Sequence, residues 1–184
     1  MIDLAEILTK IKPYVLGWTT GTLSGSANPT APFVGQTFFR ADLGWWIYWN
    51  GTYWLTAHEY SSELHRGGYA VTTDLLQAAL RTDYKPFFTR VAGSVLVATT
   101  LTASDYWIVY WMCRSVGEAQ ADWLHNPDIK PAMYAAGTWY HIEAAVNRAS
   151  TLASPAKLAW YVQRVGNPGA ISLEQVTYYR LIVT

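Results

Sequence analysis

The chain has few of the features that mark several common functional classes. It contains one cysteine, Cys113, in 184 residues, which excludes an intrachain disulfide and a cysteine-based metal site. Charged residues make up 14% of the chain, and the thirteen basic residues balance the thirteen acidic residues. Because the lysines and arginines form no cluster, nothing in the sequence could neutralise a run of phosphates. We therefore expect no nucleic-acid partner.

The sequence also lacks long apolar runs and the elements of a secretory signal. No stretch reaches the roughly 18 apolar residues that a membrane-spanning helix needs. Residues 1–18 have no basic start, no long apolar run and no small-residue cleavage site. We therefore expect no membrane insertion and no export signal.

Motifs for catalysis and cofactor binding are missing as well. The acidic residues are scattered singly, and no serine lies in a nucleophile-elbow pattern. The glycine-rich stretches do not match a phosphate-binding loop. The four histidines, His58, His65, His125 and His141, do not have metal-ligand spacing. We therefore expect no enzyme activity, cofactor or metal, although carboxylates distant in sequence can still meet in a fold, as those of glycosidases do.

What the chain does have is apolar and aromatic surface. Hydrophobic residues make up 51% of it and aromatic residues 15%, which predicts a folded protein of one domain, or of a compact domain with a small module. With zero net charge, such a chain has weak colloidal repulsion. Some of this surface is therefore expected to face another subunit.

The N-terminal segment, residues 1–16, has the pattern of a short helix. Asp3 is placed to cap it and Pro13 to end it, with apolar residues at helical spacing between them. Four of these residues follow the spacing of a coiled-coil seam and are our candidates for an oligomer interface: Leu4, Ile7, Ile11 and Tyr14. A helix packed on its own domain fits the same pattern equally well. Residues 17–32, rich in glycine, serine, threonine and proline, are interpreted as a connector.

Residues 33–60 form an aromatic hairpin module in our interpretation. Strands are predicted over 37–41, 45–49 and 52–56, with a turn at 42–44 and a second turn at Asn50-Gly51. Asn-Gly is the strongest short signal for a type I′ hairpin turn. Aromatic rings project from both faces of residues 45–49, and packing is the more common use of such rings. Sugar stacking is the alternative, with three candidate residues: Trp46, Tyr48 and Trp54.

The rest of the chain divides into a linking segment, residues 61–86, and a series of strands, residues 87–184. In the linking segment, 61–69 looks like a loop, and 72–86 looks like a short helix capped near Thr73. Beyond residue 86, strands predicted over 87–101, 105–115, 138–148, 157–165 and 171–184 follow one another without crossover helices. This pattern predicts a mainly β protein ending in an antiparallel β-sandwich of jelly-roll type.

Alternation within these strands predicts which residues form the core. Leu158, Trp160 and Val162 share one side of their strand, and Ile142 belongs to the apolar side of residues 139–147. The run "DYWIVYWMC", residues 105–113, has no polar face. It should therefore lie in the middle of a sheet or be covered by a neighbouring subunit.

Two stretches resemble proteins of tailed bacteriophages. "PFVGQTFFRADLGWWIYWNGTYWLT", residues 32–56, resembles a short module of tail fibre and tail-associated proteins. "LVATTLTASDYWIV", residues 96–109, and the segment from "WYHIEAAVNR" at residue 139 to the terminal "YYRLIVT" are similar to a β-sandwich that closes some phage structural proteins.

This resemblance implies a virion component, made in the host cytoplasm and assembled as a homotrimer with other virion proteins. The N-terminal part would attach to the particle, and the sandwich would bind host-surface glycan without catalysis. The chain lacks the long repetitive shaft of a typical fibre, which leaves open a capsid-decorating or minor structural protein that binds only virion proteins. A carbohydrate-binding or glycan-active sandwich module is the second alternative.

Overall fold

The computed structural model describes residues 24–117, 119–129, 134–153 and 155–184. They divide into two compact units, of which unit 1 comprises residues up to His58 together with Ile182–Thr184, and unit 2 comprises Glu59–Leu181. The predicted N-terminal helix and its seam residues Leu4, Ile7, Ile11 and Tyr14 lie outside the described residues. Within the described residues, no helix has the length and apolarity needed to cross a bilayer.

Unit 1 is built on the aromatic hairpin module. Its strands are β1 (Ser24–Gly25), β2 (Thr37–Arg40), β3 (Trp45–Trp49) and β4 (Trp54–Thr56), and they lie in the sheet in this order. β1 is parallel to β2, whereas β2, β3 and β4 are each antiparallel to the next strand. The chain returns to this unit after unit 2, because Ile182 bridges Leu55 and the amide of Val183 donates to the Trp54 carbonyl at 2.8 Å. The three predicted strands of the module are present: β3 has the predicted bounds, and β2 and β4 are shorter than predicted.

The core of unit 1 lies on the face of β3 that carries Ile47. Phe38, Ile47, Trp54 and Val183 are all at most 5% exposed and form one cluster. Trp45 and Trp49 pack against it from the same strand face, as strand alternation requires. Trp54 contacts Trp49 at 5.7 Å between ring centroids. Several aromatic rings of the module thus pack in or against the core of unit 1, as we expected.

The turn at Asn50 differs from the predicted type I′ turn. Trp49 pairs with Trp54, so four residues form the loop, and Gly51 has φ near 100° whereas Asn50 does not have positive φ. The Asn50 side-chain oxygen instead accepts hydrogen bonds from the amides of Thr52 and Tyr53, at 2.9 and 2.7 Å. This local side-chain capping stabilises the longer loop.

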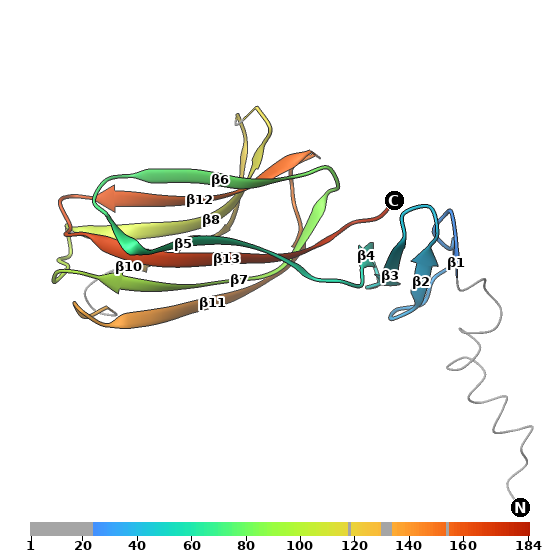
Figure 1. Cartoon of the computed structure of the whole chain (residues 1–184), viewed down its shortest axis with the longest axis horizontal. Coiled ribbons are helices and arrows are strands. Elements are labelled where there is room, and N and C mark those ends of the chain that lie inside the picture. The colour runs from blue at the N-terminus through green and yellow to red at the C-terminus, as the bar shows by residue number, and fades with distance from the viewer. Residues whose placement is uncertain (1–23, 118, 130–133, 154) are drawn as a thin grey trace, which may run out of the picture. The chain divides into compact units, whose positions relative to one another are not determined.

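Unit 2 is a sandwich of two antiparallel sheets (Figure 1). The sheet that we call sheet II has the order β10-β8-β12-β6, with β9 also paired to β8. Its strands are β6 (Leu75–Thr82), β8 (Tyr106–Ser115), β9 (Ala121–His125), β10 (Asp128–Ile129) and β12 (Ala156–Val165). The other, sheet III, has the order β11-β7-β13-β5 and contains β5 (Tyr60–Val71), β7 (Pro86–Val97), β11 (Trp139–Ala149) and β13 (Ile171–Leu181).

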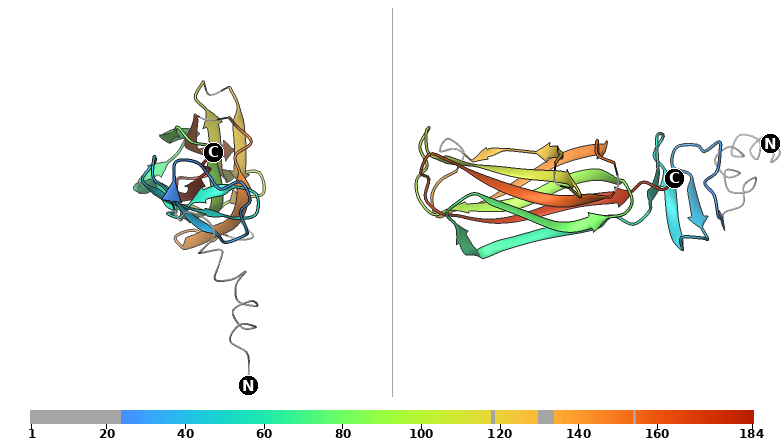
Figure 2. Two further views of the ribbon diagram at one scale, coloured as in Figure 1. Left: turned by 90° about the vertical axis from the view of Figure 1, so that its right-hand side faces the viewer. Right: turned by 90° about the horizontal axis from the view of Figure 1, so that it is seen from above.

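The connectivity of unit 2 is that of a jelly roll. Successive strands β5, β6, β7 and β8 alternate between sheets III and II, and β11, β12 and β13 alternate in the same way. The late strands β12 and β13 then fill the places between the early ones. Figure 2 shows the strands of both sheets running along a common long direction. The five strands predicted beyond residue 86 are present as β7, β8, β11, β12 and β13.

Residues 61–86 are strand rather than loop and helix, which corrects the sequence interpretation. β5 pairs with β13 and β6 pairs with β12, each at a sheet edge. The leucines and alanines of 75–80 have high helix propensity, but tertiary pairing overrides such a weak preference. Unit 2 therefore begins at Glu59, and the sandwich includes the segment that the sequence suggested was a linker.

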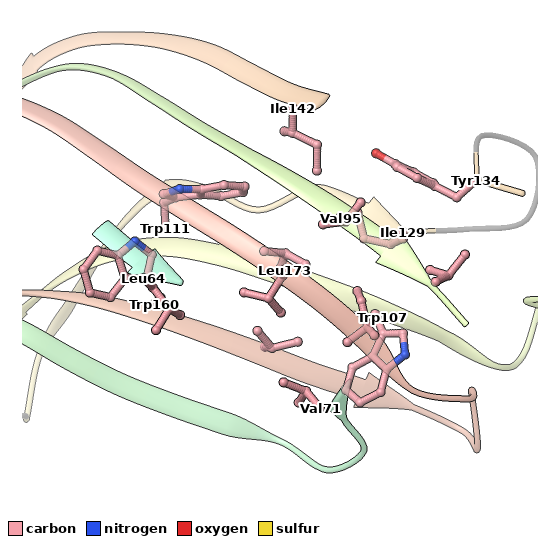
Figure 3. Packing of buried hydrophobic residues seen from close by; sticks show 14 of the residues in the cluster. Leu64, Val71, Val95, Trp107, Trp111, Ile129, Tyr134, Ile142, Trp160 and Leu173 are labelled. Atoms are coloured by element: carbon pink, nitrogen blue, oxygen red, sulfur yellow. The ribbon is translucent and has the colours of Figure 1, made fainter. Parts of the chain in front are cut away.

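The core of unit 2 lies between the two sheets and contains three fully buried tryptophans. Trp107, Trp111 and Trp160 project inward from sheet II (Figure 3). Val162 of β12 is buried in the same core cluster. Gly93 of β7 lets the Trp111 ring approach, since a Cβ there would lie 2.8 Å from Trp111 Cζ2 and also clash with the Glu174 carbonyl. The inward positions of β12 are those that strand alternation predicted.

Candidate functional site

The outer face of sheet III carries charged side chains together with the exposed Trp139. Arg90 of β7 forms an ion pair with Glu143 of β11 at 3.1 Å, and its guanidinium carbon lies 3.7 Å from the centroid of the Tyr178 ring. His141 lies 3.6 Å from the second oxygen of Glu143. Charged and polar outer positions of this kind are usual for an antiparallel sheet with one side in water.

The outer face of sheet II is aromatic and apolar instead. The side chains of β8 that belong to the core clusters are those of Trp107, Val109, Trp111 and Cys113. The even-numbered residues of β8, including the buried Met112, therefore point outward. Tyr110 pairs directly with Tyr161, which pairs in turn with Leu76. Met112 pairs with Trp123 of β9. Three neighbouring strands and β9 therefore bring aromatic and apolar side chains together on one face.

The rings of this face are held in place by one another and by hydrogen bonds. The Tyr110 and Tyr161 rings stack at 5.3 Å, and Trp123 lies 4.9 Å from Tyr110 at a tilt of 52°. The Tyr110 hydroxyl donates to Gln163 Oε1 at 2.8 Å. The Tyr161 hydroxyl donates to Asp74 at 3.1 Å. Burial, with a smaller contribution from Asp74, raises the pKa of Tyr161, so the hydroxyl stays protonated at neutral pH.

A pocket of about 350 Å³ opens on this face. Met112, which is 2% exposed, is its most buried lining residue. Trp123 on β9 and Tyr161 with Leu76 on the other flank also line it, together with Ala121 and Arg114. Trp123 is 49% exposed, so a ligand can reach its ring. A mostly apolar concavity with a few polar groups is the usual form of a ligand site.

The strand that carries Trp123 is fixed to the opposite sheet by an ion pair. Arg148 of β11 donates to both carboxylate oxygens of Asp122, at 2.8 and 3.1 Å, and to the carbonyl of Trp123 at 2.8 Å. The register of β11 shifts between Ala145 and Arg148, and Asn147 there has φ of 47°. Such a bulge re-aims a side chain. Arg148 consequently reaches β9.

These contacts keep the Asp122 carboxylate ionised. The carboxylate is only 5% exposed, and burial alone would raise its pKa. The hydrogen bonds from Arg148 and from the amide of Thr151 outweigh burial, so the pKa is lowered. Asp122 is therefore ionised at neutral pH and holds β9 through Arg148.

The three sugar-stacking candidates of the hairpin module lie in unit 1 and differ in exposure. Trp46 is 53% exposed, and its ring lies 5.4 Å from that of Phe39. Tyr48 is half-buried. Trp54 is 5% exposed within the core of unit 1, so packing against Phe38 and Trp49 leaves it no face for a sugar. Sugar stacking on Trp46 or Tyr48 stays a prediction.

Three carboxylates away from the pocket accept hydrogen bonds from an arginine, from hydroxyls or from a backbone amide of the chain. Asp42 is bound by Arg40, Glu59 by Thr89, and Asp105 by Thr102 and the amide of Asn167. Among the residues that the structure describes, no group of three histidine, cysteine or acidic side chains is close enough to hold a metal ion.

Sequence reasoning did not identify Trp123, Tyr161 or Leu76 as site residues. The available signal was the run at 105–113 without a polar face. Its inward side fills the core, and its outward side, with Tyr110 and Met112, forms part of the aromatic face. β8 does lie within a sheet, between β12 on one side and β9 and β10 on the other, as that run predicted.

Comparisons with known proteins show similarity in structure only. No protein-family model matches the chain, and no curated protein matches it in sequence. A xylan-binding module, CBM15, has 14% identity and a TM-score of 0.37, over 83% of this chain and 87% of that one.

Two further solved structures are a Desmodium yellow mottle tymovirus protein and a Bacillus endospore appendage protein of disulfide-linked pili. The first has 10% identity and a TM-score of 0.30, over 68% of this chain and 87% of that one. The second has 11% identity and a TM-score of 0.34, over 86% of this chain and all of that one. Binding modules and assembly proteins thus both occur among these neighbours, and no family is shown.

Proposed function

We propose that unit 2 is a non-enzymatic polysaccharide-binding module and that its site is the pocket on the outer face of sheet II. The observation that carries the proposal is the placement of Trp123 and Tyr161 around an open pocket with Met112 at its base. Aromatic rings offer apolar faces to the C–H groups of a sugar, and the polar tips of Trp and Tyr hydrogen-bond its hydroxyls.

The contrast between the two outer faces supports this assignment. Sheet III carries the Arg90–Glu143 ion pair and a single exposed tryptophan, Trp139, among its described residues. Sheet II instead groups Trp123 with Tyr110, Tyr161 and Leu76, which is 44% exposed. An exposed apolar patch on an otherwise soluble surface generally has a binding role. The hydroxyls of Tyr110 and Tyr161 are already fixed by Gln163 and Asp74, so the rings are pre-organised and lose little freedom on binding.

The experiment compares two exposed tryptophans in electrophoresis through gels that contain soluble polysaccharides. Trp123→Ala removes a ring from the pocket, and Trp139→Ala removes a ring of matched exposure, 46%, from β11 of sheet III. We expect polysaccharide to retard the wild type and Trp139→Ala, and Trp123→Ala to bind at least about tenfold more weakly, as for a central aromatic contact. Equal retardation of both variants would refute the assignment of the site.

We propose further that the chain is a virion structural protein of tail-fibre or tail-associated type, which presents this module to host-surface polysaccharide. The resemblance of residues 32–56 to a phage tail module supports this role. The exposed apolar residues of unit 1 also support it, because Trp46, Phe33 and Val34 are 53%, 44% and 71% exposed and suit contact with other virion proteins. The alternative is a capsid-decorating protein, which would bind other virion proteins but no polysaccharide.

The proposed assembly is a homotrimer held in part by Leu4, Ile7 and Ile11. Light scattering of the purified chain at tens of micromolar should give a trimer, and Ile7→Asp should dissociate it because the substitution buries a charge against symmetry mates. A monomeric wild type at this concentration would contradict the interface.

A further inference from the structure

The pocket on sheet II has an apolar base and an apolar flank. Met112, its most buried lining residue, is 2% exposed, and Leu76 and Ala121 add aliphatic side chains to the lining. Trp123 and Tyr161 contribute aromatic rings. Most of the lining therefore offers carbon atoms and a thioether sulfur, which replace poorly the hydrogen bonds that a sugar hydroxyl makes with water.

Two polar side chains that line the pocket are already engaged within the chain. The Tyr161 hydroxyl donates its only proton to Asp74 at 3.1 Å, so it can accept a hydrogen bond from a ligand but cannot donate one. Arg114 has an interaction partner within the chain. The neighbouring Tyr110 hydroxyl donates to Gln163 at 2.8 Å. The base of the pocket is therefore better suited to an apolar substituent than to a hydroxyl group.

Such a lining discriminates between sugars that differ in one substituent. A methyl group placed against Met112 and Leu76 leaves water and gains hydrophobic stabilisation. A hydroxyl group in the same place loses its hydrogen bonds to water without a full replacement, which weakens binding. One carbon group in an apolar pocket generally changes affinity by about 10–200-fold. Because Leu76 is 44% exposed, we expect the lower end of this range here.

We propose that the pocket selects sugars that carry a methyl group, which contacts Met112 and Leu76 while the sugar ring lies against Trp123. In polysaccharides this methyl group belongs either to a deoxy sugar or to an acetyl substituent. The hydroxyl groups of the sugar stay at the open side of the pocket, where water solvates them. This inference rests on the proposed polysaccharide-binding function and names its ligand class.

The experiment uses two ligand pairs whose members differ in the methyl-bearing group alone. L-Fucose is compared with L-galactose, which has a hydroxymethyl group in place of the methyl group, to test a deoxy sugar. Short fragments of O-acetylated glucomannan are compared with the same fragments after alkaline deacetylation, to test an acetyl group. Binding to the full chain is followed by NMR with isotope-labelled methionine methyl groups, and the chain has only three methionines.

We expect the methyl-bearing member of at least one pair to bind about tenfold more tightly than its partner. The pair that shows the preference identifies the source of the methyl group. A nuclear Overhauser effect should also connect the Met112 methyl group with the methyl group of that ligand. Equal affinity within both pairs would overturn the inference, and so would a preference without this contact to Met112.

Two leucine variants make the outcome specific to the pocket. Leu76→Gln places an amide beside the base of the pocket and should remove most of the preference, while binding through Trp123 persists. Leu96→Gln makes the same chemical change on the outer face of sheet III, where Leu96 is half-buried and pairs directly with Trp139, and it should leave the preference intact. An unchanged preference in Leu76→Gln, or an equal loss in both variants, would overturn the inference.

The failure of the underlying function gives a different result. If no member of either pair binds, and Trp123→Ala behaves as the wild type in polysaccharide gels, the binding module itself is refuted and the inference falls with it. If both members of each pair bind equally and Trp123→Ala abolishes their binding, the binding function stands and only the selection of a methyl group is overturned.

Discussion

The ion pair between Arg148 and Asp122 offers a quantitative test of how the binding face is held. Arg148→Met leaves the Asp122 carboxylate, which is 5% exposed, with the Thr151 amide but without its cation. Removing one partner of a buried pair costs about 3–5 kcal/mol. Because the Arg148 side chain is itself 37% exposed, we take the lower end. A loss of about 3 kcal/mol corresponds to a fall in Tm of about 10 °C for a unit of this size.

Asp122→Asn should cost less, although it breaks the same pair. The arginine left behind is partly exposed and can be hydrated, and the asparagine oxygen can still accept from the Thr151 amide. The loss of a hydrogen bond to a charged group costs about 1.5–3 kcal/mol, and we expect the lower value here. Urea unfolding followed by far-ultraviolet circular dichroism measures both free energies at pH 7.

The pH dependence supplies the second half of this prediction. In the wild type the pKa of Asp122 is lower in the folded state than in the unfolded state. The ionised carboxylate therefore stabilises the fold above the unfolded-state pKa, and this contribution is lost as pH falls through the folded-state pKa. In Arg148→Met, burial acts without the arginine and raises that pKa. Protonation then relieves the buried charge, so the free-energy gap to the wild type should narrow between pH 7 and pH 4.5.

Two results would refute this reasoning. If both variants lose the same stability at pH 7, the buried carboxylate is not the source of the cost. If the gap between Arg148→Met and the wild type stays constant as pH falls, Asp122 does not change its protonation in that range.

Three further predictions concern the packing of the two units. Gly93→Ala places a Cβ against Trp111 and should cost about 1–3 kcal/mol by overpacking, and unchanged urea unfolding would contradict this. Val183→Asp buries a charge in the core of unit 1, where Val183 is 2% exposed, so chymotrypsin should cleave within residues 24–58 while unit 2 still unfolds cooperatively. Loss of both transitions together would contradict their independence. Burial raises the pKa of Cys113 to about 11, so a thiol reagent at pH 8 should react only on unfolding, and rapid reaction of the native protein would disprove its burial.

The sequence predicted most strands of the sandwich but missed two strands at the sheet edges, β5 and β6. β8, β11 and β12 are marked by strict alternation or by a continuous apolar run, and these patterns are local. β5 and β6 were misread because their pairing with β13 and β12 joins residues between 74 and 119 positions apart. A helix-favouring composition such as that of residues 75–80 cannot reveal such a partner.

The binding face was only partly visible in the sequence for the same reason. The apolar outward side of β8 could be inferred from the lack of a polar face in residues 105–113. Its neighbours Tyr161, Leu76 and Trp123 come from three other strands, and only the register of those strands brings them to Tyr110 and Met112. The aromatic density of the hairpin module drew attention instead, although Trp54 lies in the core of unit 1.

The proposed function requires that the pocket on sheet II, rather than the aromatic surface of unit 1, receives the sugar. Isotope-labelled protein allows the indole N–H resonances of individual tryptophans to be followed by NMR while polysaccharide fragments are added. We expect the Trp123 resonance to shift in a saturable way, while the resonances of Trp46 and Trp139 stay in place. A saturable shift at Trp46 with none at Trp123 would contradict it.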